Sequence, residues 1–223
     1  MSFSVHSIYQ QVFKLWREKR IALFLERLRP RQSDVMLDVG GYPDVWVSRP
    51  QPVARIDTLN LYPVEWNPSV FPSHSMRTLV GDARHLSFPD RSYDIVFSNS
   101  VIEHVGGWES QKAFASEVRR VGKALWIQTP AFECPVEPHY MAFFIHWLPQ
   151  GIQRVVVRWL TPWGWIERPV RKEIGRMISN TRLLKKRELK ELFPDCEILT
   201  ERLLGVLPKS YIAVRKDDPA PAR

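Results

Sequence analysis

The stretch from residue 76 to residue 105 constrains the fold of this chain more than any other part of the sequence. A first short run, Met-Arg-Thr-Leu-Val at residues 76–80, ends in Gly81-Asp82, and a second, more apolar run opens with Tyr93-Asp94 after a short loop. Short apolar runs bounded by glycine and turn residues are typical of buried strands. The stretch therefore predicts two buried strands and places the Asp82 carboxylate at the rim of a sheet.

The same pattern of apolar runs and turns recurs along the chain. Buried strands that alternate with helices indicate a parallel, doubly wound sheet, and a closing hairpin adds antiparallel pairing. The sequence thus predicts an α/β fold with a doubly wound, mostly parallel, seven-stranded Rossmann-like sheet, an antiparallel last strand and a helical, Trp-rich insertion after the fifth strand. Further strands are expected at residues 35–39, 53–61, 124–128, 197–203 and 209–214, and helices at residues 108–121 and 184–193.

The 223 residues give room for a single domain, which divides into four parts. Apolar residues at helical spacing predict one or two amphipathic helices in an N-terminal segment at residues 1–30. The sheet core is expected at residues 33–130, and an insertion crowded with Pro and Trp follows at residues 131–180. A closing helix and β-hairpin at residues 184–215 complete the domain.

Composition excludes several broad classes of protein. Hydrophobic residues make up 44% of the chain and charged residues 25%, which is ordinary for a globular protein and unlike a disordered one. No apolar run approaches the roughly eighteen residues of a membrane-spanning helix, and the N-terminus lacks the pattern of a secretory signal. Cys134 and Cys196 match no metal-ligand spacing. We therefore expect a cytoplasmic protein, with peripheral membrane association left open, and no metal site.

The net charge of +8 is concentrated in one block. Between Arg154 and Lys190 there are eleven Lys or Arg against three Glu, a surplus of 11 − 3 = +8, so the rest of the chain is nearly neutral. A local basic block favours an acidic partner such as nucleic acid, anionic lipid or a phosphorylated substrate. A solvated helix face explains the same block equally well.

Within this block the segment at residues 152–165 is apolar and rich in Trp, and Arg168, Arg171 and Lys172 follow it closely. Trp together with Arg at a non-polar surface suits a membrane interface or a lipid-linked substrate. The competing interpretation is a helical cap that packs on the sheet, with a homodimer contact as a further role.

Glycines and polar side chains stand where three of the expected strands end. Asp38 and the pair Gly40-Gly41 close the first strand, where glycine lets a ligand come close to the backbone. Asn60 closes the second strand and is positioned to accept a bond from a ribose hydroxyl. Period-two alternation puts Asp57 on the opposite face, so Asn60 is favoured over it. Asp82 closes the third strand, where its carboxylate can accept from an exocyclic amine such as that of adenine.

The order of these motifs resembles that of a known family. The chain reads Asp38-Val-Gly-Gly after the first strand, Leu59-Asn-Leu after the second and Gly81-Asp-Ala after the third. It continues at residues 88–105 with Phe-Pro-Asp-Arg-Ser-Tyr-Asp-Ile-Val-Phe-Ser-Asn-Ser-Val-Ile-Glu-His-Val. Over roughly residues 33–130 this resembles class I S-adenosylmethionine-dependent methyltransferases of the UbiE-like group, and residues 204–214 resemble the last antiparallel strand pair of that family.

The resemblance implies an enzyme that uses S-adenosylmethionine, and it makes residues 33–130 the cofactor-binding core. It implies contacts of Asp38, Gly40 and Gly41 with the amino-acid portion of the cofactor, Asn60 with the ribose, Asp82 with the adenine amine, Ala83 with the adenine ring, and Ser98 with the methionine moiety.

The acceptor side has its own candidates. The resemblance places Glu103 and His104 at the floor of the substrate opening, and a neutral imidazole such as that of His104 can take a proton near physiological pH. Glu137 and His139 follow in the insertion after the fifth strand and are the next candidates for binding the acceptor or acting as the general base. A packing role is open for each histidine, and a site of two His and one carboxylate for a metal is less favoured.

Three functions remain open from the sequence. The favoured one is O-methylation of a small molecule, glycan or lipid-linked intermediate by in-line transfer with a His/Glu base. An RNA methyltransferase would use the basic block at residues 154–190, but the chain reads Ser98-Asn-Ser-Val where enzymes that methylate base amines carry an Asp/Asn-Pro-Pro-aromatic turn. A non-catalytic methyltransferase-like binding protein is the third, because the glycine loop reads Gly40-Gly-Tyr-Pro and Asn60 replaces the usual acid.

Overall fold

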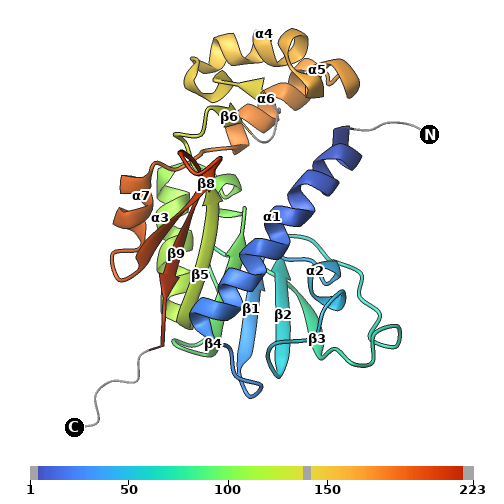
Figure 1. Cartoon of the computed structure of the whole chain (residues 1–223), viewed down its shortest axis with the longest axis vertical. Helices are drawn as coiled ribbons and strands as arrows, with labels where there is room; N and C mark the ends of the chain where they lie inside the picture. Colours follow the sequence, from blue (N-terminus) through green and yellow to red (C-terminus); the bar gives the residue numbers. More distant parts are fainter. Residues whose placement is uncertain (1–4, 138–141, 218–223) are drawn as a thin grey trace.

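The computed structural model describes the backbone of residues 5–137 and 142–217, and the side chains within those ranges from residue 16 onward. Figure 1 shows one sheet with helices on both of its faces and a separate group of helices above the edge at which the parallel strands end. No helix in the described ranges is both long enough and apolar enough to cross a membrane.

Seven strands form the sheet. Their bounds are Val35–Val39 (β1), Arg55–Asn60 (β2), Met76–Val80 (β3), Tyr93–Asn99 (β4), Gly122–Pro130 (β5), Glu197–Leu203 (β8) and Leu207–Arg215 (β9). The order across the sheet is β3-β2-β1-β4-β5-β9-β8. β1 to β5 run parallel, whereas β9 pairs antiparallel with both β5 and β8. The predicted doubly wound, mostly parallel, seven-stranded sheet with an antiparallel last strand is confirmed.

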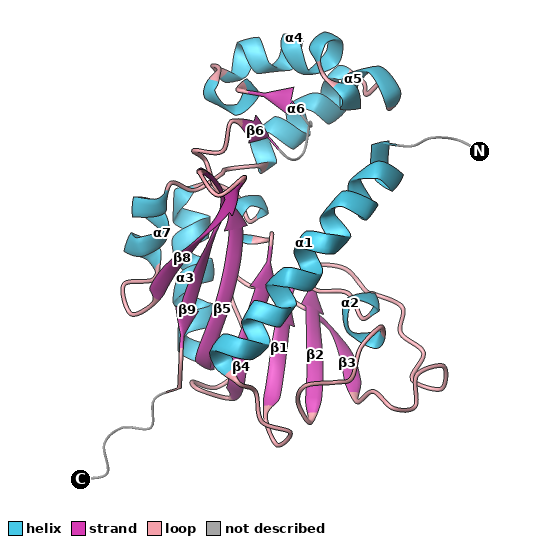
Figure 2. Ribbon diagram, in the orientation of Figure 1, coloured by secondary structure: helices cyan, strands magenta, loops and turns pink. Residues whose placement is uncertain are grey.

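Helices cover both faces of this sheet (Figure 2). The residues of β1 show how the core divides, because successive side chains of a strand point to opposite faces. Met36 belongs to a buried cluster with Phe24 and Trp46, whereas Leu37 belongs to the cluster on the other face with Phe114. The helices on the first face are α1 (Val5–Leu28) and α2 (Asp44–Val47), and those on the second are α3 (Trp108–Val121) and α7 (Lys186–Leu192).

The insertion after β5 carries a helical cap, which we define as residues 142–180. The cap has a small core of its own, in which Val157, Ile174 and Ile178 are buried. A short antiparallel pair, β6 with β7, leads into it. The elements are β6 (Val136–Glu137), β7 (Ala142–Phe143), η2 (Ile145–Trp147), α4 (Gln150–Leu160), α5 (Pro162–Ile166) and α6 (Arg171–Asn180).

Element boundaries follow the expected ranges with a few differences. The N-terminal segment is one continuous helix, α1, where one or two helices were expected. The helix expected from residue 184 begins at Lys186, because Leu184 instead forms a parallel β-bridge with Ala131. Neither α2 nor the β6–β7 pair was predicted, since four- and two-residue elements are too short to leave a periodic pattern.

Candidate functional site

The turn after β1 requires glycine at positions 40 and 41. Gly40 has φ +73°, a left-handed conformation that side chains rarely adopt, and a Cβ there would overlap Cγ2 of Val101. A Cβ on Gly41 would overlap the Asp38 carboxylate. Both glycines line a cavity, so the backbone here is open to a ligand.

Asp38 sits beneath this turn and is almost fully buried. The indole Nε1 of Trp46, from α2, donates to Asp38 Oδ2 at 2.7 Å. Burial raises the pKa of Asp38 to about 7, although the bond from Trp46 acts in the opposite direction. The carboxyl group also lines the cavity. It is therefore a buried acceptor whose ionised form a ligand cation would stabilise.

The cavity has a volume of about 530 Å³, within the usual range for small-molecule sites. It opens at the carboxyl ends of β1, β4 and β5, which is where ligands bind in open α/β sheets. α1 and the β8–β9 hairpin close its sides. The charged and polar side chains that line it are Arg17, Arg20, Asp38, Tyr42, Asn99, Ser100, Glu103, Gln128, Lys209 and Ser210.

The end of β4 bends into the cavity. Ser100 has φ +58°, and its hydroxyl donates to Gln128 Oε1 at 2.9 Å. A residue other than glycine in this conformation stores backbone strain, which is common at ligand sites. Ser98, two residues earlier, is fully buried and donates to the carbonyl oxygen of Val39 at 3.1 Å. Ser98 thus joins β4 to the end of β1, while the next two residues line the cavity.

The residues expected around the adenosine portion lie at the same sheet edge but outside the lining of this cavity. Asn60 donates from Nδ2 to the carbonyl oxygen of Gly41 at 2.8 Å, which ties the end of β2 to the glycine turn. Asp82 forms an ion pair with Arg84 and accepts from the Arg84 backbone N–H at 2.9 Å, so its pKa lies below its usual value. Ala83 is buried.

Asp57 has a structural role and is bound by neighbouring side chains. Its buried carboxylate accepts from Arg77 Nε at 2.8 Å, from Arg55 Nε at 3.0 Å and from the Tyr93 hydroxyl at 3.0 Å. Burial opposes ionisation, but these hydrogen bonds hold the pKa of Asp57 below its usual value. The carboxylate is thus bound by three side chains of the protein and does not line the cavity.

The candidates for proton transfer are separated by the fold. Glu103 is fully buried and lines the cavity, and Thr129 Oγ1 donates to its Oε2 at 3.0 Å. His104, the next residue of η1 (Ile102–His104), is exposed and outside the cavity lining. Glu137 is buried in β6, also outside that lining, and His139 lies outside the described residues.

α1 contributes side chains that we did not predict. Arg20 donates from Nη2 to Glu201 Oε2 at 2.8 Å and from Nη1 to Asn99 Oδ1 at 2.6 Å. This arrangement joins the first helix to the end of β4 and to β8. One signal was visible in the sequence: Arg20 lies four residues after Trp16 and four before Phe24, so it shares the apolar face of the helix.

Lys209, on β9, is a further cation in the cavity lining. Its Nζ lies 3.5 Å from the ring centroid of Trp16 on α1, a cation–π contact. Burial, together with the nearby Arg20, lowers the pKa of Lys209 to about 8. A substantial fraction of this amine is therefore neutral at slightly alkaline pH.

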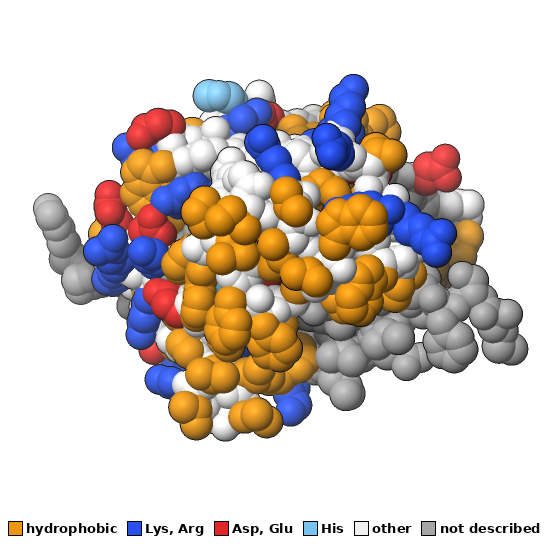
Figure 3. Space-filling view, turned by 90° about the horizontal axis from the view of Figure 1, so that it is seen from above, with side chains coloured by type: hydrophobic (Ala, Val, Ile, Leu, Met, Phe, Trp, Pro, Cys, Tyr) orange, Lys and Arg blue, Asp and Glu red, His pale blue; other side chains and the backbone are white. Residues whose placement is uncertain are grey.

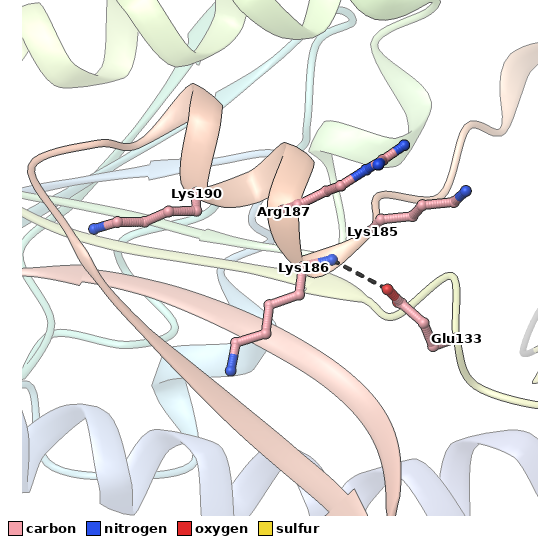
Figure 4. Close-up of a pocket in the computed structure, with 5 residues that line it drawn as sticks. All are labelled: Glu133, Lys185, Lys186, Arg187 and Lys190. Atoms are coloured by element: carbon pink, nitrogen blue, oxygen red, sulfur yellow. Dashed lines mark hydrogen bonds between the residues drawn. The ribbon is translucent and has the colours of Figure 1, made fainter.

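A separate shallow hollow lies at the start of α7 (Figure 4). The backbone N–H of Lys186 donates to Glu133 Oε1 at 3.3 Å across it, and the Tyr211 hydroxyl donates to the other Glu133 oxygen at 2.9 Å. The rest of its lining is basic, from Lys185, Lys186, Arg187 and Lys190.

Within the described residues, no group of three or more His, Cys, Asp or Glu side chains is arranged to hold a metal ion. His146, the other histidine of the insertion, lies with its Nε2 2.9 Å from the carbonyl oxygen of Phe132. Burial lowers the pKa of His146.

Sequence comparison finds a similarity to a known family in the central segment of the chain. A family profile described as a methyltransferase domain matches residues 59–124, which run from the end of β2 into β5. This segment holds Asn60, Asp82, Ala83, Ser98 and Glu103. No curated protein matches the chain.

Solved structures share the fold at low sequence identity. A SAM-dependent methyltransferase from Methanosarcina mazei is 17% identical over 86% of this chain and 95% of its own, with a TM-score of 0.51. The magnesium protoporphyrin IX methyltransferase of Synechocystis PCC 6803, solved with bound SAH, is 12% identical over 96% of this chain and 89% of its own, with a TM-score of 0.57. A third structure is a chain from the complex between the Haloferax volcanii Trm112 methyltransferase activator and a protein assigned as a methyltransferase. It is 15% identical over 89% of this chain and 88% of its own, with a TM-score of 0.51. These comparisons do not address the UbiE-like subgroup, which stays a prediction.

Proposed function

We propose that this chain is a class I S-adenosylmethionine-dependent methyltransferase that methylates an oxygen atom of a small-molecule, glycan or lipid-linked acceptor. The observation that carries the proposal is one cavity at the carboxyl edge of the sheet. Asp38, Gly40 and Gly41 line the same space as Glu103 and Lys209. A cofactor-binding turn and groups suited to a polar acceptor are thereby brought together.

The residues of this turn fit the cofactor. Gly40 and Gly41 line the cavity with bare backbone, and a side chain at either position would displace Val101 or Asp38, so the turn keeps a close approach open for the amino-acid portion. Asp38 offers a buried acceptor for a cation, and Asn60 fixes the turn through the Gly41 carbonyl oxygen. Asp82 and Ala83 are proposed for the adenine and Ser98 for support of the methionine end.

S-adenosylmethionine supplies a methyl group on a positively charged sulfur that is already electrophilic, so positioning of the two reactants accounts for much of the rate. The protein positions the reactants in a cavity whose sides are formed by α1 and the β8–β9 hairpin. Asn99, held by Arg20, and Gln128, bonded to Ser100, present fixed polar groups to an acceptor. A rigid polar rim of this kind orients a hydroxyl toward the cofactor turn.

Glu103 is the proposed proton acceptor. The sequence favoured His104, Glu137 and His139 for this role, but Glu103 lines the cavity, whereas His104 and Glu137 do not. The Thr129 hydroxyl holds one of its carboxylate oxygens. A hydroxyl acceptor that approaches the cofactor turn can pass its proton to a carboxylate at this position.

Two measurements test the proposal. Calorimetric titration with S-adenosylhomocysteine should give measurable heat, and its absence would refute cofactor binding. Extracts incubated with radiolabelled cofactor, followed by mass spectrometry of the labelled product, should then identify the acceptor and the methylated atom.

A Glu103→Gln variant tests the proton acceptor. We expect turnover to fall by about 10²- to 10⁴-fold with little change in cofactor affinity, because the amide retains the shape but not the basicity. Glu109→Gln, an exposed change on α3, is the matched control and should leave turnover unaltered. Wild-type turnover in Glu103→Gln would remove this role.

RNA is the second candidate acceptor, and the basic hollow at α7 favours it. If RNA is methylated, label from the cofactor should enter the RNA fraction of an extract. Transfer should then weaken steeply with salt, because phosphate contacts release counterions. Lys186→Glu combined with Lys190→Glu should lower that transfer while leaving cofactor affinity unchanged.

A further inference from the structure

The cap presents an unusually apolar outer surface. Figure 3, seen from above the cap, shows hydrophobic side chains gathered at the centre of this face with Lys and Arg around them. Ten large hydrophobic side chains of the cap are between 46% and 66% exposed. Single exposed apolar residues are normal, but a contiguous group marks an interaction surface. The ten are Phe143, Phe144, Trp147, Ile152, Val155, Trp159, Leu160, Trp165, Ile166 and Val170.

Helix α4 has apolar residues on two opposite sides. Val157 is fully buried in the small core of the cap. At 3.6 residues per turn, Ile152, Val155 and Trp159 lie on the side turned away from Val157, and all three are exposed. The outward stripe is therefore not needed for the cap to fold. It continues onto α5, because the Trp165 indole donates to the carbonyl oxygen of Trp159.

Cations surround this stripe. Residues 142–180 contain six Lys or Arg and two Glu, a surplus of 6 − 2 = +4. Arg158 lies 4.9 Å from the ring centroid of Trp159 and donates to the Gly164 carbonyl oxygen at 2.8 Å, which fixes a guanidinium beside the exposed indole. Arg154 is exposed on the same helix. The surface thus combines an apolar centre with a basic rim.

We infer that the cap docks on the surface of an anionic lipid bilayer. Trp side chains favour the interface between headgroups and acyl chains, and an apolar helix face flanked by Arg is the pattern of interfacial helices. Each basic residue near an anionic leaflet adds further attraction. The cap lies above the edge of the sheet at which the cavity opens (Figure 1), so docking brings that edge to the lipid surface.

A second copy of this chain fits the surface less well. A two-fold contact places the same patch against itself, so the two basic rims would face each other. Like charges brought together in this way oppose association. An anionic bilayer instead offers the opposite charge and an apolar layer at once. This inference does not depend on methyl transfer, because it concerns the outer face of the cap alone.

Co-sedimentation of the full chain with vesicles tests the inference. We expect binding to an equal mixture of phosphatidylcholine and phosphatidylglycerol, and at least about tenfold weaker binding to phosphatidylcholine alone. Val155→Ser combined with Trp159→Ser should weaken binding to the mixed vesicles at least about tenfold, because two apolar side chains no longer enter the interface. Tyr62→Ser, an exposed change outside the cap, is the matched control and should bind as wild type.

Three outcomes would overturn the inference. The first is no binding to mixed vesicles by a folded protein, with folding checked by circular dichroism. The second is equal binding to both kinds of vesicle, which would remove the role of the basic rim. The third is a wild-type protein that does not bind vesicles but self-associates, with the self-association lost in the Val155→Ser, Trp159→Ser variant. That result would assign the surface to a second copy of the chain. Cofactor binding measured on the same samples shows whether the methyltransferase site is intact in each case.

Discussion

Asp38→Asn should stabilise the protein at alkaline pH while weakening cofactor binding. The folded protein raises the pKa of Asp38 from 3.8 to about 7, because the carboxyl group is buried. Below about pH 4 the group is neutral in both the folded and unfolded states and no penalty arises. As the pH rises toward 7, the unfolded chain ionises first, so stability is lost over that interval.

The magnitude follows from the two pKa values. A difference of about three units corresponds to roughly 4 kcal/mol at pH 8, which is an upper bound because Asn is also a polar group to bury. The Asn side chain oxygen can still accept from the Trp46 indole. Even a quarter of this amount shifts the unfolding midpoint of a domain of this size by about 2–4 °C.

The assay is urea unfolding of both proteins at pH 5, 6, 7 and 8. The stability advantage of Asp38→Asn should grow with pH and level off above 7, while other titrating groups cancel in the difference. Asp44→Asn, an exposed change in α2, controls for the loss of one charge. Cofactor affinity should fall, and for the wild type it should rise with pH up to about 7, because a bound cation favours the ionised carboxylate. A stability difference that is flat with pH would refute the reasoning.

Three further predictions concern other parts of the site. Asp82→Ala should weaken S-adenosylhomocysteine binding in calorimetry while the protein stays folded, and unchanged affinity would show that the adenine lies elsewhere. Gly40→Ala should lower the free energy of unfolding by about 1–3 kcal/mol, because alanine is strained in the left-handed backbone conformation and its Cβ would overlap Val101. Gly175→Ala is the control: this glycine of α6 has open space around it, so the change should be neutral or stabilising. Arg20→Met should cost about 3–5 kcal/mol because the largely buried Glu201 carboxylate loses its guanidinium partner and keeps only the bond from the Ser210 hydroxyl. Arg20→Met with Glu201→Leu should recover part of this loss, and no recovery would argue against the ion pair.

The centre of the sheet was predictable from sequence because its strands are covered on both faces. A strand buried on both sides is a continuous apolar run, as at β1 and β4, and glycine or turn residues mark its ends. The ends of β1, β2 and β3 then fix which polar residues share one edge. This is why Asp38, Asn60 and Asp82 could be placed at the same rim before the fold was known.

The cavity could not be predicted in the same way, because long-range packing forms it. The contact of Trp16 with Lys209 and the ion pair of Arg20 with Glu201 join segments more than 180 residues apart. No local pattern encodes such a pair. The structure also separates Glu103 from His104, since neighbouring residues in a 3-10 turn point in different directions, and the sequence alone favoured the histidine.

The link between α1 and the β8–β9 hairpin has a consequence for how the protein is made. A protein is synthesised from its N-terminus to its C-terminus, so the residues of α1 are made long before those of β9. Two walls of the cavity come from these two elements, and the cavity therefore closes only when the last strand inserts between β5 and β8. Contacts so distant in sequence are slow to form. A ligand that binds only the closed cavity would stabilise that final step by mass action, so occupancy of the site reports that the whole domain has assembled.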